Sequence, residues 1–275
     1  MRSRSLTRFV PSPAGLVVPL AGLLIWWLVT RFHFIAPLFL PSPGEVAQAW
    51  HDASPTLAGH AVATLLRLMV GFTVGFLVGY GLGLAMILFK PVRLMLAPAI
   101  DSGRPAPTVA TLPFFLLWFG FALYGQVCFV ALGVALIVAS AVVDAGRAVS
   151  PHLIRTAQTF QATPWQLART VIMPGLLPQL APTLRICLGI AGSLTVASEF
   201  MGADRGLGVL MELSRRTLRT ENLLLFTFVL GALVMACDVV LRVCLAYHLR
   251  WMPSASEALG KLPPTPLIER HRRCS

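Results

Sequence analysis

The sequence has few charged residues: Asp, Glu, Lys and Arg together make up 12% of its 275 residues. Soluble proteins carry about 25%, and 56% of this chain is hydrophobic. A soluble core does not absorb that much apolar surface. The composition therefore predicts one membrane-embedded domain spanning residues 13–250, between an N-terminal tail (1–12) and a basic C-terminal tail (251–275).

Patterns typical of disulfide, metal and catalytic sites are also missing. The five cysteines form no CxxC and no paired spacing, and the six histidines form no HExxH. The sequence shows no combination of a nucleophile and a base that is typical of an enzyme active site. It also has no GxxxxGK[ST] motif, which binds nucleotide phosphates in ATPases. We expect no metal, no other cofactor and no catalytic residue, and we expect any ATP hydrolysis to occur on another chain.

The net charge of +11 is large, and basic patches attract nucleic acid. In this chain, however, the basic residues gather at the two ends and in particular loops between apolar runs. The positive-inside rule produces that distribution in membrane proteins. The charge therefore indicates membrane topology and contact with lipid rather than nucleic-acid binding.

Six segments approach the roughly 20 apolar residues that cross a bilayer: 13–30, 63–89, 108–124, 126–143, 178–199 and 222–249. The first has no small-residue cleavage site and closes with Trp26 and Trp27, which suits an uncleaved span. A tight turn around Tyr124, Gly125 and Gln126 separates the third and fourth. Lys and Arg fall mainly in alternate loops, so we predict an all-α polytopic bundle of six transmembrane helices with both termini cytoplasmic.

The second predicted span has glycine at every fourth position: Gly71, Gly75, Gly79 and Gly83. Small residues at that spacing line one helix face and let another helix approach closely. The face pairs either with another subunit or with a helix of the same bundle. The second interpretation is favoured, because glycine is common in membrane helices and the motif is weak.

Residues 101–107 read DSGRPAP, and Asp101 and Arg104 would be costly facing lipid. We predict that a continuous helix is interrupted here by three prolines: Pro105, Pro107 and Pro113. Broken backbone at membrane depth is tolerated where it lines a cavity. The stretch is therefore either part of a solute pathway or an elbow at the membrane surface. Arg185 either adds to an anion-friendly pathway with Arg104 or snorkels to the interface.

The most informative segment is the hydrophilic loop of about residues 144–174, between the fourth and fifth predicted spans. Ser150 is suited to cap a first short helix, with Pro151 at its first position and an end near Phe160. Only Arg155 and Arg169 offer basic contacts, so a DNA-reading helix pair is a poor interpretation.

A second helix repeats the device, because Thr163, Pro164 and Gln166 form an N-cap, a helix-starting proline and a capping box. We expect this helix to end near Met173, since Pro174 cannot continue it. The loop then forms two helices that project from the membrane. It is predicted to dock a cytoplasmic partner.

Residues 155–174, RTAQTFQATPWQLARTVIMP, resemble the EAA loop of binding-protein-dependent ABC transporter permeases, in particular the nitrate/sulfonate/taurine branch. LPSPGEV (40–46), TLLRLMVGFTVGFLVGYGLGL (64–84), RPAPTVATLPFFLLWFGFALYGQ (104–126) and SEFMGADRGLGVL (198–210) also resemble motifs of that branch, in the same order. The resemblance assigns an ATPase-coupling role to Arg155, Thr156, Ala157, Gln161, Thr163, Trp165 and Pro174.

The resemblance implies a non-catalytic permease subunit in the inner membrane of a bacterium. Such a subunit forms the pathway for a small solute (aliphatic sulfonate, taurine, nitrate or similar). It pairs with a second permease copy, as a homodimer, and with cytoplasmic ABC ATPase subunits. A periplasmic or lipid-anchored binding protein delivers the solute.

Three positions in the resemblance carry particular interest. Glu199 lies where the family carries a glutamate, and it is either part of an outer gate or an interfacial helix-end residue. Arg155 stands where the family has glutamate, and Gln161 where it has glycine. A left-handed conformation at glutamine costs about 1–2 kcal/mol, unless the turn differs. Either the partner ATPase has adapted to these changes or coupling is impaired.

The alternative is an ATP-independent secondary transporter or channel, which uses intramembrane acids as ion or proton sites. The candidate acids are Asp101, Glu199 and Asp238, but Asp238 and Arg242 have the spacing of a helix ion pair. No inverted repeat is evident. The importer permease is therefore the favoured hypothesis.

Overall fold

The computed structural model describes residues 13–103, 108–120, 122–147, 149 and 151–249. Every regular element in this part of the chain is helical, which confirms the predicted all-α class. The two predicted tails lie outside the described residues. The elements are α1 (Pro13–Arg31), α2 (Pro43–Leu88), α3 (Lys90–Gly103), a 3-10 turn (Thr108–Thr111), α4 (Leu112–Phe119), α5 (Leu123–Arg147), α6 (Pro151–Thr159), α7 (Pro164–Leu167), a π-helical turn (Ala168–Ile172), α8 (Met173–Phe200), α9 (Leu207–Arg216) and α10 (Thr220–His248).

Four helical stretches of the described chain are long and apolar enough to cross a membrane: Pro43–Leu88, Leu123–Arg147, Trp165–Phe200 and Thr220–His248. They correspond to the second, fourth, fifth and sixth predicted spans. Two shorter apolar segments, Val17–Arg31 and Thr108–Phe119, occupy the places of the first and third. At 1.5 Å per residue, Thr108–Phe119 is shorter than the roughly 30 Å of a bilayer core.

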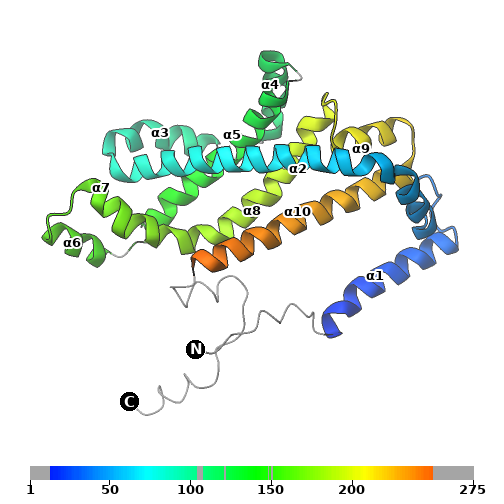
Figure 1. Cartoon of the computed structure of the whole chain (residues 1–275), viewed down its shortest axis with the longest axis horizontal. Coiled ribbons are helices and arrows are strands. Elements are labelled where there is room, and N and C mark those ends of the chain that lie inside the picture. The colour runs from blue at the N-terminus through cyan, green and yellow to red at the C-terminus, as the bar shows by residue number, and fades with distance from the viewer. Residues whose placement is uncertain (1–12, 104–107, 121, 148, 150, 250–275) are drawn as a thin grey trace, which may run out of the picture.

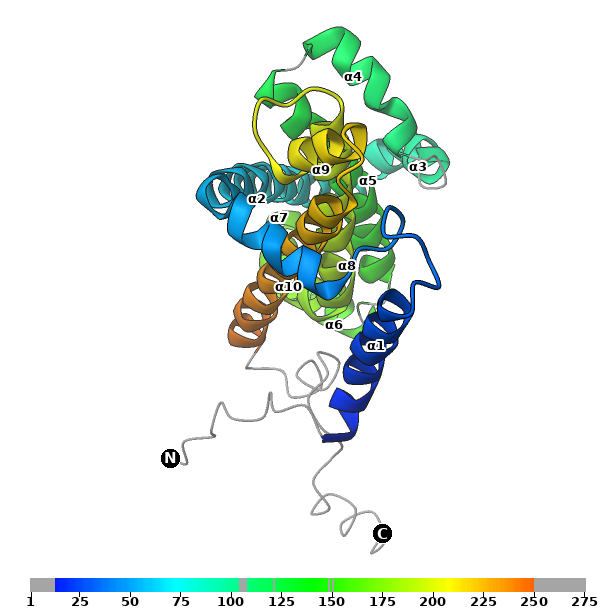
Figure 2. The same ribbon diagram turned by 90° about the vertical axis from the view of Figure 1, so that its right-hand side faces the viewer.

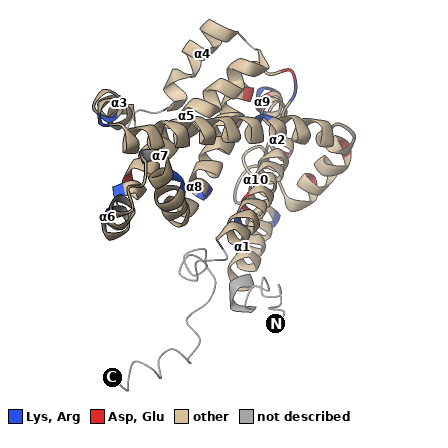
Figure 3. Cartoon of the chain, turned by 60° about the vertical axis from the view of Figure 1, so that its left-hand side comes forward, with Lys and Arg blue, Asp and Glu red and all other residues tan. Residues whose placement is uncertain are grey.

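The long helices lie side by side, with α2 running across α5, α8 and α10 (Figure 1). The short helices α6 and α7 lie at one end of this bundle, and α9 lies at the other. Helix α1 stands beside the bundle rather than within it (Figure 2). Figure 3 shows long uncharged stretches in the bundle helices, with charged residues at α3, α6, α8 and α9 and along α10.

Helix α2 begins about 20 residues before the predicted second span. Ser42 and Glu45 explain this start, because they form a capping box. The Glu45 amide donates to Ser42 Oγ (3.3 Å), the Ser42 amide donates to Glu45 Oε2 (2.6 Å), and Pro43 takes the first helical position. The LPSP element is therefore the start of a helix of 46 residues.

The four spaced glycines of α2 are buried against α5. A Cβ atom at Gly75 would lie 2.6 Å from the Ala131 carbonyl oxygen, and one at Gly79 would lie 2.5 Å from that of Ala135. Contacts this short leave room for hydrogen but not for a methyl group. The glycine face therefore lies inside the bundle, where it brings the α2 and α5 backbones together.

The predicted turn around Tyr124, Gly125 and Gln126 is wrong, since these residues lie in the first turn of α5. The chain turns earlier, at Gly120, which caps α4 with a φ of 62° and donates its amide to the Leu116 carbonyl. Glycine adopts this conformation without the steric cost that other residues meet. Gly125 remains helical, with its Cα so close to Phe119 that a Cβ would lie 2.6 Å from that side chain.

Candidate functional site

The predicted docking loop is an exposed pair of short helices at one end of the bundle (Figure 1). Helix α6 covers Pro151–Thr159, while the expected cap Ser150 lies outside the described residues. Large apolar side chains project from the loop: Leu153 is 56% exposed, Phe160 81% and Trp165 62%. These are the large apolar side chains that are exposed in the described part of the loop.

The second short helix starts as predicted. Thr163 and Gln166 form the reciprocal capping box, with the Thr163 amide donating to Gln166 Oε1 (2.8 Å) and the Gln166 amide donating to Thr163 Oγ1 (3.3 Å). This local chemistry fixes where α7 begins and leaves Trp165 in its first turn.

Gln161 has a φ of 54°. This is the left-handed conformation that the family's glycine at this position implies. The Ala162 amide donates to the Ala157 carbonyl (3.1 Å), which is the six-to-one bond of a Schellman motif. Helix α6 therefore ends as a glycine-terminated helix does, although glutamine stands at the strained position. Of the other predicted coupling residues, Arg155 and Thr156 are exposed on α6, and Ala157 is half-buried.

The expected helix end near Met173 is wrong. The chain passes from α7 through the π-helical turn Ala168–Ile172 directly into α8, and the Met173 amide donates to the Ala168 carbonyl five residues back. Pro174 has no N–H and its ring clashes with a preceding carbonyl in a regular α-helix. The wider π turn places Pro174 at the start of α8, so the helix continues. The second short helix of the docking loop and the spanning helix α8 thus form one continuous helical stretch, Trp165–Phe200.

The structure describes three of the six predicted pathway residues: Pro113, Arg185 and Glu199. Arg104, Pro105 and Pro107 lie outside the described residues, and Pro113 is exposed in the first turn of α4. Arg185 is half-buried and donates through Nε to Asp238 Oδ1 of α10 (2.9 Å). The predicted pair of Asp238 with Arg242 is confirmed, with Arg242 Nε donating to Oδ2 at 2.7 Å. One carboxylate therefore receives two guanidinium groups.

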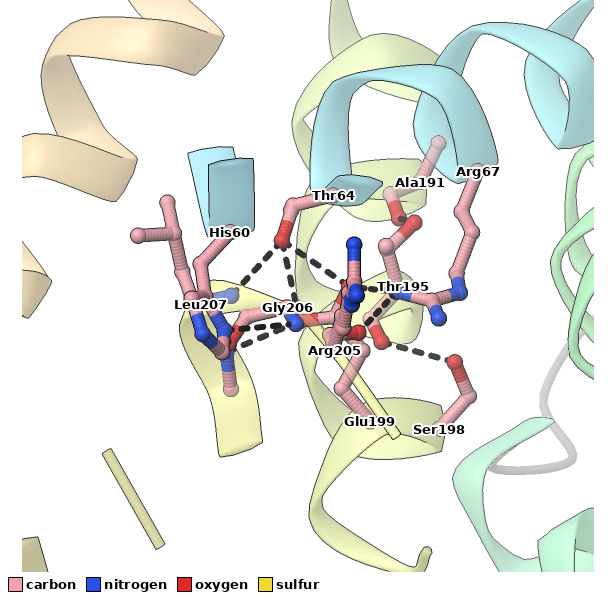
Figure 4. Close-up of polar contacts among 11 residues, drawn as sticks. His60, Thr64, Arg67, Ala191, Thr195, Ser198, Glu199, Arg205, Gly206 and Leu207 are labelled. Carbon is pink, nitrogen blue, oxygen red and sulfur yellow. Dashed lines mark hydrogen bonds and ion pairs between the residues drawn. The ribbon is translucent and has the colours of Figure 1, made fainter. Parts of the chain in front are cut away.

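Glu199, the last predicted gate residue, is 1% exposed near the end of α8. Its carboxylate accepts from Arg67 Nη1 (2.8 Å) and from Thr64 Oγ1 (2.9 Å), both on α2. It also accepts from the amide of Gly208 at the start of α9 (2.8 Å). Figure 4 shows Glu199, Thr64 and Arg67 converging between α2, α8 and the segment before α9. Glu199 is therefore buried at a junction of α2, α8 and α9, one residue before the end of α8.

The segment before α9 is shaped around this carboxylate. Gly206 has a φ of 149°, and a Cβ atom there would lie 2.3 Å from Glu199 Cδ. The Leu207 amide donates to Thr64 Oγ1 (2.8 Å), and His60 Nδ1 lies 3.0 Å from the Gly206 carbonyl. Arg67 donates to the Arg205 carbonyl as well. The GLG motif thus lets the backbone approach Glu199 closely enough to bond to it.

Arg67 belongs to this junction, although no motif in the sequence singles it out. It lies within the apolar run TLLRLMVGF, and its side chain is 9% exposed. An arginine inside a spanning segment requires an anionic partner, and that requirement was the available signal. The partner is 132 residues away in the sequence.

A groove of about 540 Å³ lies between α5 and α8. Polar groups enter it from both helices, with Ser140 and Asp144 on α5 and Gln179 and Thr183 on α8. An acidic residue such as Asp144 on a spanning helix usually faces the bundle interior or a water-filled cavity rather than lipid. The groove opens close to the helical unit that carries the docking loop, because Gln179 is only five residues beyond Pro174.

Helix α9, at the opposite end of the bundle, carries a separate exposed charge cluster (Figure 3). Glu212 accepts from Arg215 and from Arg216, each through Nε at 2.8 Å. The hydrogen bonds from Arg215, and next those from Arg216, lower the pKa of Glu212 to about 2. This cluster repeats the arrangement at Asp238, one carboxylate with two arginines, outside the long helices.

Comparison with known proteins agrees with this architecture. The taurine transport system permease protein TauC of Escherichia coli (strain K12) is 34% identical over 229 residues, which are 80% of this chain and 82% of TauC. The riboflavin transport system permease protein RibX of Chloroflexus aurantiacus is 34% identical over 92% of this chain and 96% of RibX. The putative aliphatic sulfonates transport permease protein SsuC of Bacillus subtilis (strain 168) is 26% identical over 87% and 88%.

Among solved structures, an inward-facing conformation of the MetNI methionine ABC transporter superposes with a TM-score of 0.56. The match has 21% identity and covers 70% of this chain and 97% of that one, which shows a shared fold. Residues 5–252 match the family described as the binding-protein-dependent transport system inner membrane component. The chain belongs to this family of ABC importer permeases and is a component of the bacterial inner membrane.

Proposed function

We propose that this chain forms the translocation pathway for a small solute and couples it to ATP hydrolysis by a separate subunit. The observation that carries the proposal is a continuous helix, Trp165–Phe200, which links an exposed apolar loop to the groove between α5 and α8. A displacement of the loop then moves one wall of the groove. A rigid helix of this kind is one of the elements that can carry coupling between two sites.

In the proposed topology, residues 13–250 form a single transmembrane domain that crosses the membrane six times, with residues 1–12 and 251–275 as cytoplasmic tails. The docking loop is cytoplasmic, and α9 with the Glu199 junction lies on the outer side. The separation of α6–α7 from α9 at opposite ends of the bundle supports this orientation. So does the bias of Lys and Arg toward alternate loops.

The proposed partners are two cytoplasmic ABC ATPase subunits, a second copy of the chain and a periplasmic or lipid-anchored binding protein. The ATPase groove receives the loop residues Arg155, Thr156, Ala157, Gln161, Thr163 and Trp165, and Pro174 begins the helix that transmits the movement. The exposed Phe160 and Trp165 supply the apolar contact area. Arg155 makes an acidic ATPase surface the complementary one.

The proposed solutes are taurine, an aliphatic sulfonate, nitrate or a similar small molecule, because relatives with 26–34% identity are named for taurine and aliphatic sulfonates. Arg104, Pro105, Pro107 and Pro113 are proposed to border the pathway. Glu199 is proposed to act as an outer gate residue by holding α8 against α2. If the pathway opens at the outer end, the Arg67–Glu199 ion pair must either break or move together with both helices.

Crosslinking tests the docking claim. Single cysteines at positions 155, 161 and 165, in a chain without its native cysteines, should crosslink to the ATPase subunit in a reconstituted complex. A cysteine at Leu213, which is 57% exposed on α9 at the opposite end, should not. Crosslinks from position 213 alone would refute the proposed orientation and docking site.

Uptake in proteoliposomes tests the function as a whole. Proteoliposomes that contain the chain with its ATPase and binding protein should accumulate radiolabelled taurine only when ATP is present on the side of the membrane that carries the ATPase. Accumulation driven by an ion gradient without ATP would instead identify a secondary transporter.

A further inference from the structure

The charge cluster between α8 and α10 is not used by the mechanism above. Asp238 of α10 accepts from Arg185 of α8, through Nε at 2.9 Å and Nη2 at 3.3 Å. It also accepts from Nε and Nη2 of Arg242, one turn further along α10. Two guanidinium groups therefore share one carboxylate, and the cluster carries a formal charge of +1.

The donors of this cluster are incompletely used. Each arginine bonds Asp238 through Nε and Nη2, and within the described residues neither Nη1 group has a hydrogen-bond partner. The Arg185 and Arg242 side chains are 31% and 33% exposed, whereas Asp238 is 18% exposed. The cationic side of the cluster therefore faces outward, and the carboxylate faces the bundle.

The surroundings of the cluster are apolar. Ile186 (63% exposed), Met235 (64%) and Val239 (39%) are its exposed neighbours in the sequence, and both helices are long enough to span the membrane. Asp238 lies ten residues before the end of α10, which corresponds to about 15 Å at 1.5 Å per residue. An uncompensated positive charge in such a place is costly unless an anion covers it.

We propose that Arg185 and Arg242 together bind a tetrahedral oxyanion at the surface between α8 and α10: the phosphate of an anionic phospholipid or a free sulfonate or sulfate. Guanidinium groups suit this ligand, because their planar N–H donors pair with phosphate and sulfonate oxygens. Asp238 positions both arginines, and the unused Nη1 groups supply the binding donors. This anion site depends on the proposed function in one respect only, namely that α8 and α10 cross a membrane.

The test uses the full-length chain in phosphatidylcholine nanodiscs. The thermal unfolding midpoint is measured with and without phosphatidylglycerol at constant total lipid. It is also measured with sodium sulfate and with sodium chloride at equal ionic strength. The bound anion should raise the midpoint by about 3–5 °C at tenfold its Kd. A rise with phosphatidylglycerol alone assigns the site to lipid, and a rise with sulfate assigns it to a free oxyanion.

Two variants and a control locate the effect. Arg242→Gln and Arg185→Gln each leave a neutral arginine–aspartate pair, so each should abolish the rise, and either one suffices if the other fails to fold. Arg216→Gln makes the same change in the two-arginine cluster of α9 and should keep the full rise. No rise in the unmodified chain, or an equal rise in the Gln variants of Arg185 and Arg242, would overturn the proposal. Loss of ATP-dependent uptake with the rise intact would count against the proposed function alone.

Discussion

Arg67 on α2 and Glu199 on α8 form an ion pair of 2.8 Å between Nη1 and Oε1, with side chains that are 9% and 0% exposed. Removing two charges from water is costly, and hydrogen bonds to the remaining groups of the pair offset part of that cost. Thr64 and the Gly208 amide provide those bonds to the carboxylate. The pair therefore fixes the end of α8 against α2 and ties α9 to both.

Neutralising Glu199 should destabilise the protein strongly. In Glu199→Gln the Arg67 guanidinium stays buried without its counter-charge, for which we expect a loss of about 3–5 kcal/mol. Denaturant unfolding of the purified chain in detergent measures the change. Glu212→Gln is the control, because Glu212 pairs with two arginines that are 67% and 70% exposed, and exposed pairs contribute little. Similar losses in the two variants would show that burial of the Glu199 pair does not matter.

A methyl group at Gly79 should separate α2 from α5. The added Cβ would meet the Ala135 carbonyl oxygen at 2.5 Å and Val138 Cβ at 2.9 Å, so Gly79→Ala should cost about 1–3 kcal/mol through overpacking. Gly81 lies on the same helix, and a Cβ there meets nothing within 4 Å. Gly81→Ala should leave the thermal unfolding midpoint unchanged or raise it, because alanine favours the helix. A lower midpoint for Gly81→Ala than for Gly79→Ala would contradict the packing account.

Local chemistry could be predicted from the sequence, and long-range pairing could not. The capping box of Thr163 and Gln166 depends on residues three apart, so its residue types are sufficient to predict it. The ion pair of Asp238 with Arg242 is predictable for the same reason, because the two residues are four positions apart on one helix. The partner of Arg67 depends on how α2 packs on α8, and nothing near Arg67 in the sequence indicates a residue 132 positions away.

The two corrected boundaries have a similar explanation. Gly120 and Gly125 both suit a turn by residue type. In the structure Gly120 has a φ of 62°, whereas Gly125 lies in the first turn of α5 and packs against Phe119. Pro174 forbids a regular α-helix through its own position, but not a helix with a π turn ahead of it. Residue type limits the backbone at each position, and the tertiary structure selects among the remaining conformations.

Glycine at position 161 should stabilise the end of α6. Gln161 has a φ of 54°, where a Cβ atom costs about 1–2 kcal/mol and glycine adopts the conformation freely. Part of that gain is lost to the greater freedom of glycine in the unfolded chain, so Gln161→Gly should slow amide exchange at Ala162 by an amount equivalent to about 1 kcal/mol. Gln161→Ala keeps the Cβ and should give no such gain. Equal protection in both variants would show that the backbone conformation at this position is not strained.

Alanine at position 174 should change how the docking loop is joined to α8. Pro174→Ala restores an N–H and removes the ring, so the π turn at Ala168–Ile172 no longer has to make room for proline. Relaxation to a regular α-helix takes the extra residue of that turn up into the helical register and rotates α7 against α8 by about 100°, the angle per residue of an α-helix. Position 165, at the start of α7, then faces another direction. A single cysteine at position 165 should therefore lose its crosslink to the ATPase subunit when Pro174→Ala is added, while the thermal unfolding midpoint rises. Pro182→Ala, in the regular part of α8, should raise the midpoint and keep the crosslink. A crosslink that survives Pro174→Ala would mean that the π turn is set by the packing of the buried Ala168 and Ile172 rather than by the proline.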